Sequence, residues 1–155
     1  MMKLIDILDS TPIPVGYRMA FIVNFFREPN MRRMERETGL IRPELTVLIC
    51  LNFRQGLNAR DICEITEQPS NTVSRAVNAL LAKGLVTSTR DPVDTRRKLL
   101  GLTDEGQRLH DRVMAIFAES ERRMLEALTG EEVETLTRLL DKLARDVARW
   151  SPGTQ

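Results

Sequence analysis

The chain has 155 residues with 42% hydrophobic side chains, which is the length of one ordinary domain with enough apolar material for a packed core. This composition excludes a disordered chain, and the low content of Gly and Pro, 8 and 7 residues, favours helices joined by short connections. No apolar run approaches the roughly 20 residues of a membrane-spanning helix, which excludes a helical membrane protein.

The net charge of +1 conceals an uneven distribution of charge along the chain. Residues 54–101 carry eight Lys or Arg against five Asp or Glu, whereas residues 102–155 carry eight against eleven. A basic middle and an acidic end fit a DNA-binding part joined to a part that stays away from DNA, although differences of this size also arise by chance.

The N-terminus and the cysteines indicate the cellular compartment. The first ten residues lack the basic and then apolar layout of a signal peptide, so we expect a soluble, cytoplasmic protein with reduced thiols. Cys50 and Cys63 have no paired spacing and are best explained as small buried hydrophobic residues. Because the chain has one His, we expect neither a Cys/His metal site nor a cofactor.

The first half of the chain predicts three helices. Apolar spacing predicts a long helix over residues 14–38, ended by Gly39, and a second helix over residues 43–54 with its proline in the first turn. Asn58 is a favourable N-cap residue, and Asp61 follows it near the positive end of a helix. We therefore expect a short third helix from Ala59 to Thr66.

A fourth helix opens at Pro69 and continues to Lys83, where Gly84 provides the left-handed residue that commonly ends a helix. Its apolar residues recur at spacings of three and four, which buries one face. The other face is polar and includes Ser70, Asn71, Thr72, Ser74, Arg75 and Asn78.

After Gly84 the periodicity changes to short stretches compatible with strands. Residues 85–88 and 98–102 predict a two-stranded hairpin, with Asp91-Pro92 as turn chemistry between them. The tip of this hairpin is expected to extend from Arg90 to Arg97 and to be charged. Its candidate DNA-binding residues are Arg90, Asp94, Arg96 and Arg97.

Two further helices complete the chain. The fifth begins at Thr103-Asp104-Glu105 and carries an apolar stripe as far as Leu128. A capping box over residues 129–132 begins the sixth, whose apolar residues extend to Val147 with alternating spacings of three and four. This spacing is typical of a helix that packs on another helix.

The order of these elements predicts a mainly α fold with a small β-hairpin, in which residues 43–102 form a winged helix-turn-helix DNA-binding domain. The polar face of the fourth helix supplies hydrogen-bonding groups for base edges in the major groove. An arginine of the hairpin tip suits the narrow minor groove, with a carboxylate to hold the guanidinium. The alternatives are a solvated helix face and a hairpin edge protected by charge.

At these residues the chain resembles the MarR family of bacterial regulators. Asp94-Thr95-Arg96 and the stretch LGLTDEG over residues 100–106 resemble the wing signature of that family. Val73-Ser74-Arg75, Leu80 and residues 83–86 resemble its recognition helix and the exit into the wing. The order of the predicted helices and strands resembles that of the family over the whole chain, residues 1–155, which we treat as a single unit.

The resemblance implies a homodimer in which the first, fifth and sixth helices interlock, so residues 1–38 and 103–150 would form an all-helical dimerisation region. It also implies a palindromic operator in double-stranded DNA, read by the fourth helix, with Arg96 in the minor groove steadied by Asp94. Many members are repressors released by small phenolic or lipophilic acids, and we expect such an effector here, of unknown identity. Other members sense oxidation through a cysteine of the first helix, and the positions of Cys50 and Cys63 argue against that role.

Two other function classes stay open at this point. The first is a winged-helix protein-interaction module that does not bind DNA. The second is an enzyme, which we do not expect, because the motifs G-x-x-x-x-G-K-[ST], G-x-G-x-x-G, G-x-S-x-G and H-E-x-x-H are absent. The single His110 leaves no convincing Ser/His or Cys/His pair.

Overall fold

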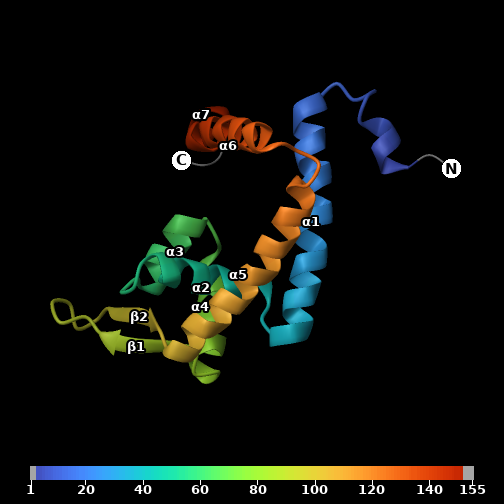
Figure 1. Ribbon diagram of the computed structural model, residues 1–155. Coiled ribbons are helices and arrows are strands. Elements are labelled where there is room, and N and C mark those ends of the chain that lie inside the picture. Colours follow the sequence, from blue (N-terminus) through green and yellow to red (C-terminus); the bar gives the residue numbers. More distant parts are fainter. Residues whose placement is uncertain (1–2, 152–155) are drawn as a thin grey trace. The chain divides into compact units, whose positions relative to one another are not determined.

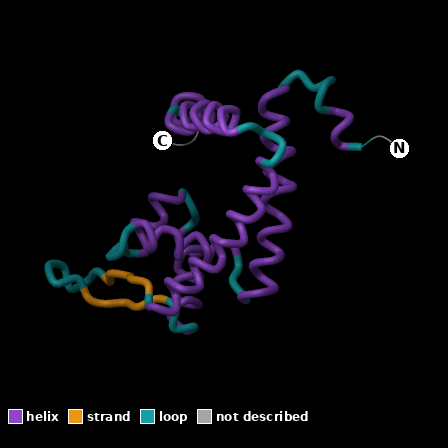
Figure 2. Tube along the Cα trace, in the orientation of Figure 1, coloured by secondary structure: helices purple, strands orange, loops and turns teal. Residues whose placement is uncertain are grey.

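A computed structural model describes residues 3–151 and divides the chain into two compact units, residues 1–118 and 119–155 (Figures 1 and 2). The first unit contains η1 (Leu4–Ile7), α1 (Pro14–Thr38), α2 (Arg42–Phe53), α3 (Ala59–Thr66), α4 (Ser70–Ala82), β1 (Val86–Arg90) and β2 (Lys98–Leu102). Helix α5 (Asp104–Leu125) continues into the second unit, which also contains α6 (Gly130–Arg145) and α7 (Val147–Trp150). No helix within the described range is long and apolar enough to cross a membrane.

Residues at the helix ends account for the boundaries of the predicted helices. Gly39 adopts a φ of 69° at the C-cap of α1, in the left-handed region where glycine is favoured. Asn58 caps α3 by accepting hydrogen bonds from the N–H groups of Arg60 and Asp61 at 2.9 and 3.0 Å. Thr129 caps α6 in the same way through the N–H of Glu132. The mainly α fold with one hairpin is confirmed.

The core of the first unit lies among α2, α3, α4, the root of the hairpin and α5. Its fully buried side chains include Leu48 and Leu51 of α2, Ile62 of α3, Leu80 of α4 and Val113 of α5, each with an exposed fraction of 0%. Burial of each such side chain contributes about 1.5–3 kcal/mol to folding, so this core holds α4 and the hairpin in place.

The hairpin is anchored to the helical core along the outer edge of β2. Strands β1 and β2 pair antiparallel, with Val86 opposite Leu102 and Arg90 opposite Lys98. Residues 56 and 57 pair with the outer edge through two backbone hydrogen bonds to Leu100, of 2.9 and 2.8 Å. One residue earlier, the side chain of Gln55 accepts a hydrogen bond from the N–H of Leu102 at 2.8 Å. The edge strand is therefore covered by the loop between α2 and α3.

Two predicted boundaries were wrong. Strand β1 continues to Arg90, so this arginine lies in the ladder opposite Lys98 and not in the loop at the tip. Strand pairing uses backbone hydrogen bonds, so it continues through Thr89 and Arg90 although neither side chain is apolar. Both side chains are exposed, so the apolar pattern that marks a half-buried strand is missing here. The sixth helix also ends earlier than Val147, because Asp146 separates α6 from α7 and accepts a hydrogen bond from Arg149.

Each unit exposes large apolar side chains on its helices. In the first unit they lie on α1 and include Val15, Met19, Ile22, Val23 and Phe25. In the second unit no residue of α6 is buried, and Leu136, Leu139, Leu140 and Leu143 are 38–48% exposed. Exposed apolar patches of this kind are typical of surfaces that bind another molecule.

Gly106, in the first turn of α5, lies against the backbone of Leu85 where α4 leads into the hairpin. A Cβ atom at this position would overlap the carbonyl oxygen of Leu85. We expect Gly106→Ala to lower the free energy of unfolding by about 2 kcal/mol or more, because backbone atoms must move to relieve the overlap. Urea unfolding monitored by circular dichroism measures this change.

Gly16→Ala provides the matched control, because nothing lies within 4 Å of the added methyl group in α1. It should leave stability unchanged or raise it by roughly 0.5–1 kcal/mol, since alanine loses less backbone entropy in a helix. Equal stability of the two variants would contradict the close approach of α5 to the hairpin root.

Candidate nucleic-acid interface

Helix α4 buries its apolar face and thereby exposes its polar face. Val73, Ala76, Val77 and Leu80 are 0–6% exposed and pack towards α2 and α3. Of the six polar residues predicted to contact DNA, five are exposed and Thr72 is half-buried; the exposed ones are Ser70, Asn71, Ser74, Arg75 and Asn78. The polar face is thus fixed in direction by the packing of the opposite face.

The turn that leads into α4 leaves the first residues of the helix exposed to solvent. Pro69 was predicted in the first turn of the helix but is its N-cap residue, one position before the first helical residue, Ser70. Its carbonyl accepts hydrogen bonds from the N–H groups of Thr72 and Val73. Before it, Glu67 adopts a left-handed φ of 54° at the end of α3. Helix α4 therefore presents Ser70 and Asn71 at its N-terminal end, which is the end that enters the major groove in helix-turn-helix proteins.

Two aspartates order the tip of the hairpin through its backbone. The Asp91 carboxylate accepts hydrogen bonds from the N–H groups of Val93 and Asp94 at 2.8 and 3.3 Å. These bonds, with a smaller contribution from the charge of Arg97, lower the pKa of the Asp91 carboxyl. The Asp94 carboxylate accepts a hydrogen bond from the backbone N–H of Arg96 at 3.1 Å. Asp94 thus holds the backbone of Arg96, whereas the expected contact of a carboxylate with the Arg96 guanidinium is not present among the described residues.

Four cations around α4 and the hairpin lack an acidic partner. The side chains of Arg75, Arg90, Arg96 and Lys98 form no hydrogen bond or ion pair within the described part of the chain. Arg90 and Lys98 also lie directly opposite each other in the ladder, where like charges destabilise a hairpin. By contrast, Arg33, Arg108 and Arg122 pair with carboxylates three or four residues away on their own helices. These unpaired positive charges are available to an anionic partner.

Arg97 differs from the other cations of the wing. Its guanidinium lies 3.7 Å from the carboxylate of Asp61, which also accepts a hydrogen bond from the N–H of Asn58 at the start of α3. This ion pair joins the wing to α3. Because the pair is half-exposed, its energy is small, and its main effect is to direct the Arg97 side chain towards α3.

Residues of α3, α4 and the hairpin together line two adjoining hollows in the surface. The first is lined by Ser74 and Asn78 of α4 together with Ser88 and Lys98 of the hairpin. The second lies between the first turn of α3 and the wing, and its lining includes Arg60 and Arg96. Ala59 and Lys98 line both.

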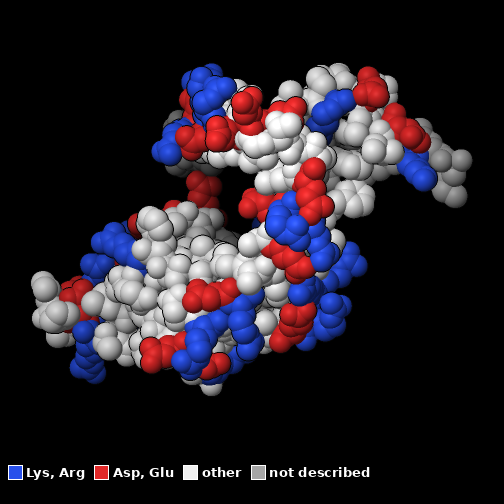
Figure 3. Space-filling model, viewed as in Figure 1, with Lys and Arg blue, Asp and Glu red and all other residues white. Residues whose placement is uncertain are grey.

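The polar face of α4, the start of α3 and the wing therefore form one continuous surface, which we call the α3–α4–wing surface. Figure 3 shows basic side chains on both sides of the hairpin at the left of the view.

Several residues of this surface were not among the predicted contacts. Asn58 and Arg60 were assigned only to the start of a helix and Ser88 only to a strand, and Lys98, which adjoins the charged tip, was not named as a candidate. The register places Lys98 opposite Arg90 in the ladder. The contribution of α3 depends on how its first turn lies beside the wing, which is a contact between separate segments of the chain.

The cysteines and the histidine lie outside this surface. Cys50 is 9% exposed in the core, where burial raises the pKa of its thiol, and Cys63 packs against the same core. His110 is buried, and its Nδ1 lies 3.0 Å from Oδ1 of Asp111, which lowers the pKa of that carboxyl. Within residues 3–151, no cluster of His, Cys, Asp and Glu side chains has the makings of a metal site.

Comparison with known proteins decides the family. The model of the MarR family matches residues 38–97, which include α2, α3, α4, β1 and most of the wing tip. The regulator YdgJ of Bacillus subtilis is 32% identical over 113 residues, which cover 73% of this chain and 67% of YdgJ. The repressor MdtR of the same species is 30% identical over 76% of both chains. The chain belongs to the MarR family of transcriptional regulators.

Solved structures of related proteins agree with this assignment. A mutant of MepR from Staphylococcus aureus, bound to an oligodeoxyribonucleotide, is 27% identical, with a TM-score of 0.62 over 85% of this chain and 96% of MepR. The regulator PcaV of Streptomyces coelicolor, in complex with its natural ligand, is also 27% identical, with a TM-score of 0.62 over 89% of this chain and 94% of PcaV. The MarR-type chain described here is thus a winged-helix transcriptional regulator of a DNA-binding family, and this family consists of regulators rather than enzymes.

Proposed function

We propose that this MarR-family chain is a cytoplasmic repressor that binds a palindromic operator as a homodimer and is released by a small-molecule effector. In this proposal residues 43–102 bind DNA, and residues 1–38 and 103–150 form the dimer. The observation that carries the proposal is the α3–α4–wing surface, on which Ser74 and Asn78 of α4 and the unpaired cations Arg96 and Lys98 line two adjoining hollows.

The α3–α4–wing surface suggests a distinct role for each element. Helix α4 enters the major groove, where Ser70, Asn71, Ser74, Arg75 and Asn78 meet base edges or phosphates, with Thr72 behind them. The wing reaches the adjacent minor groove through Arg96, whose guanidinium is unpaired and whose backbone Asp94 steadies. Arg90 and Lys98 contact phosphates. Arg97, paired with Asp61, contacts DNA at the junction of the wing with α3.

The exposed apolar faces of α1 and α6 support dimerisation. An isolated chain would leave leucines of α6 and several apolar residues of α1 in water. Burying each of these side chains in an interface is worth up to about 1.5–3 kcal/mol. A two-fold dimer presents two recognition helices to half-sites about one helical turn apart, roughly 10 base pairs, which is why the operator is proposed to be palindromic.

Repression and effector release rest on the family resemblance and on two relatives. MdtR is named a repressor, and PcaV is described with its natural ligand. Small phenolic or otherwise lipophilic acids are the proposed class of effector. Their binding would favour a dimer geometry that no longer fits the operator, because a ligand shifts an equilibrium towards the state that it binds more tightly.

Arg96→Ala should weaken binding to the operator, because the wing loses the guanidinium that is proposed to enter the minor groove. Fluorescence anisotropy with the duplex upstream of the chain's own gene measures this affinity. Arg108→Ala is the control, because it removes an arginine that is paired with Glu105 on α5. If the Arg96 variant binds as tightly as the parent at physiological salt, the wing does not contact DNA.

In the same assay Arg75→Ala should lower affinity and relax base choice at one position of the half-site, by roughly 1–3 kcal/mol for a bidentate base contact. A uniform loss over all sequences would instead identify Arg75 as a phosphate contact. If the parent chain binds no duplex, the protein-interaction module becomes the better description of this fold.

Leu140→Asp in α6 should convert the dimer to a monomer, because it places a charge in the proposed apolar interface. Sedimentation equilibrium measures the mass directly, and the variant should also lose operator affinity because a monomer meets one half-site only. Thr135→Asp, an equal change of charge at an exposed polar position of α6, should leave the dimer intact. A parent chain that sediments as a monomer would contradict the dimer itself.

If an aromatic or other lipophilic acid is the effector, it should raise the melting temperature of the free protein, because it binds the folded and not the unfolded chain. A ligand present at about 100 times its Kd adds about 2.7 kcal/mol to the free energy of unfolding, which a thermal-shift assay readily detects. The same compound should weaken operator binding in the anisotropy assay. A stabilising compound without effect on DNA binding would be a ligand of the protein but not its effector.

A further inference from the structure

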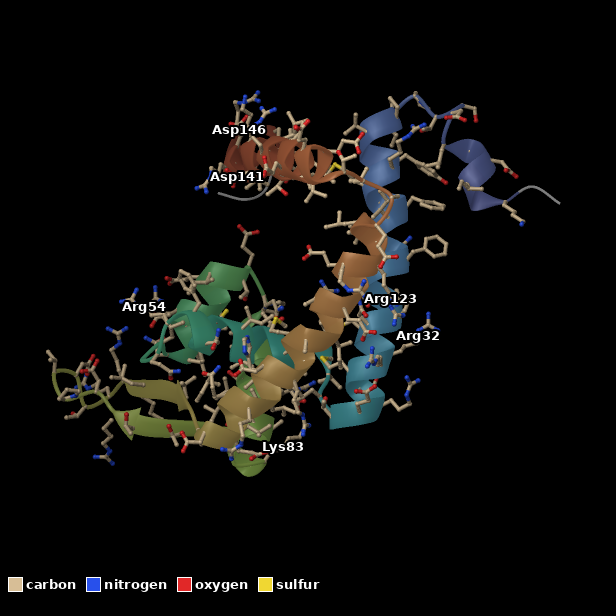
Figure 4. All side chains as sticks on the ribbon, viewed as in Figure 1. Arg32, Arg54, Lys83, Arg123, Asp141 and Asp146 are labelled. Carbon is tan, nitrogen blue, oxygen red and sulfur yellow. The ribbon has the colours of Figure 1, made fainter. Side chains whose placement is uncertain are left out.

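The ammonium group of Lys83 joins three helix ends at the C-terminal end of α4. Lys83, the C-cap residue of α4, donates hydrogen bonds from Nζ to both carboxylate oxygens of Glu44 at 2.9 Å and to the carbonyl oxygen of Gly39 at 3.3 Å. Glu44 lies in the first turn of α2, and Gly39 is the C-cap of α1. The ammonium group thus uses its three N–H donors on acceptors from two other helices. Figure 4 labels Lys83 at the lower end of α4.

This contact differs from surface ion pairs of the chain in burial and in reach. The side chain of Glu44 is 5% exposed, whereas the carboxylates of Glu37, Asp61 and Glu119, which also take part in ion pairs, are 31–45% exposed. Glu44 also accepts a hydrogen bond from the N–H of Ile41 at 3.0 Å. The Lys83 side chain is 40% exposed, so burial applies to the carboxylate alone. Removing Lys83 would leave the buried Glu44 carboxylate without its positive partner, which is costly.

The location of the pair connects the recognition helix to α1. Leu40, between Gly39 and α2, is completely buried, so the junction of α1 with α2 is fixed in the core. Lys83 holds the last turn of α4 to this junction from the outside. The ends of α1 and α4 are therefore expected to move together.

We propose that Lys83 is a positioning residue whose ionic contact with Glu44 and Gly39 sets the angle of α4 relative to α1, and thereby the half-site spacing that the dimer accepts. This inference rests on the proposed DNA-binding function and on α1 as part of the dimer interface. Lys83 itself lies at the end of α4 that does not enter the groove.

Helix geometry shows that a small change of angle suffices. Helix α4 has 13 residues and is therefore about 20 Å long, at 1.5 Å per residue. A tilt of about 10° about its C-terminal end displaces its N-terminus by about 3.4 Å, which equals the rise of one base pair in each strand. Because both recognition helices of the dimer can shift in this way, loss of the Lys83 contact is expected to broaden the accepted spacing by about one to two base pairs.

The test compares the parent dimer with Lys83→Met and Glu44→Gln on three palindromic duplexes whose half-site centres differ by one base pair. Lys83→Met keeps the length of the side chain without its charge. Glu44→Gln keeps an acceptor for the N–H of Ile41 but removes the negative charge. Arg108→Met is the control, since it removes an exposed ion pair within α5 alone. Circular dichroism at the assay temperature verifies that each variant is folded.

We expect the parent and the control to bind the duplex of one spacing about 10-fold or more tightly than the other two. Both the Lys83 and the Glu44 variant should reduce this ratio of affinities by about 3-fold or more. A purely structural role would lower thermal stability but leave the ratio between duplexes unchanged among folded molecules. Folded variants that keep the parent's ratio would overturn the positioning role alone. A parent that binds all three duplexes equally would overturn the positioning role but not the proposed function. A parent that binds none of them would contradict the proposed function as well.

Discussion

The arrangement of this protein depends on the burial of one face of α4. Val73, Ala76, Val77 and Leu80 can leave water only by packing on α2 and α3, and this packing turns the opposite, polar face outwards. The direction of the candidate DNA-reading face is therefore a consequence of the hydrophobic core. Any change that shifts α4 in the core also shifts every group that is proposed to meet a base edge.

The polar contacts around α4 and the hairpin fall into two groups with different physical roles. Asp91, Asp94 and Gln55 satisfy backbone N–H groups and so define the shape of the wing and its root. The cations of the wing are left largely without such partners, and Arg90 and Lys98 even oppose each other. A hairpin with this charge arrangement is less stable alone than in contact with an anion. This is the physical reason for preferring a nucleic acid over an apolar partner at this surface.

The helices outside the winged-helix part differ in their apolar surface. Some of their charges pair within one helix, as between Arg33 and Glu37 or Arg122 and Glu126, and large apolar side chains of α1 and α6 remain exposed. A surface with exposed leucines suits a protein partner rather than DNA. The two parts of the chain thus differ in the kind of surface that they offer, in agreement with the division of charge along the sequence.

Local sequence signals determined most of the elements and the family of this protein. Gly39, Asn58, Gly84 and Thr129 define helix ends through interactions with their immediate neighbours, so those boundaries could be predicted within one or two residues. The exposed polar face of α4 could be predicted for the same reason, because helical periodicity separates it from the buried face. The end of α6 at Asp146 was missed because the apolar pattern continues across it.

Only the tertiary structure decided which side chains of the surface act together. Asp61 appeared in the sequence as a residue near a helix N-terminus, yet it also pairs with Arg97 across 36 positions in the chain. Lys83 appeared as a residue of the helix end, yet it holds a buried carboxylate 39 positions away. Contacts between distant segments depend on how helices pack, and the sequence pattern of each helix specifies which face is buried but not which neighbour it meets.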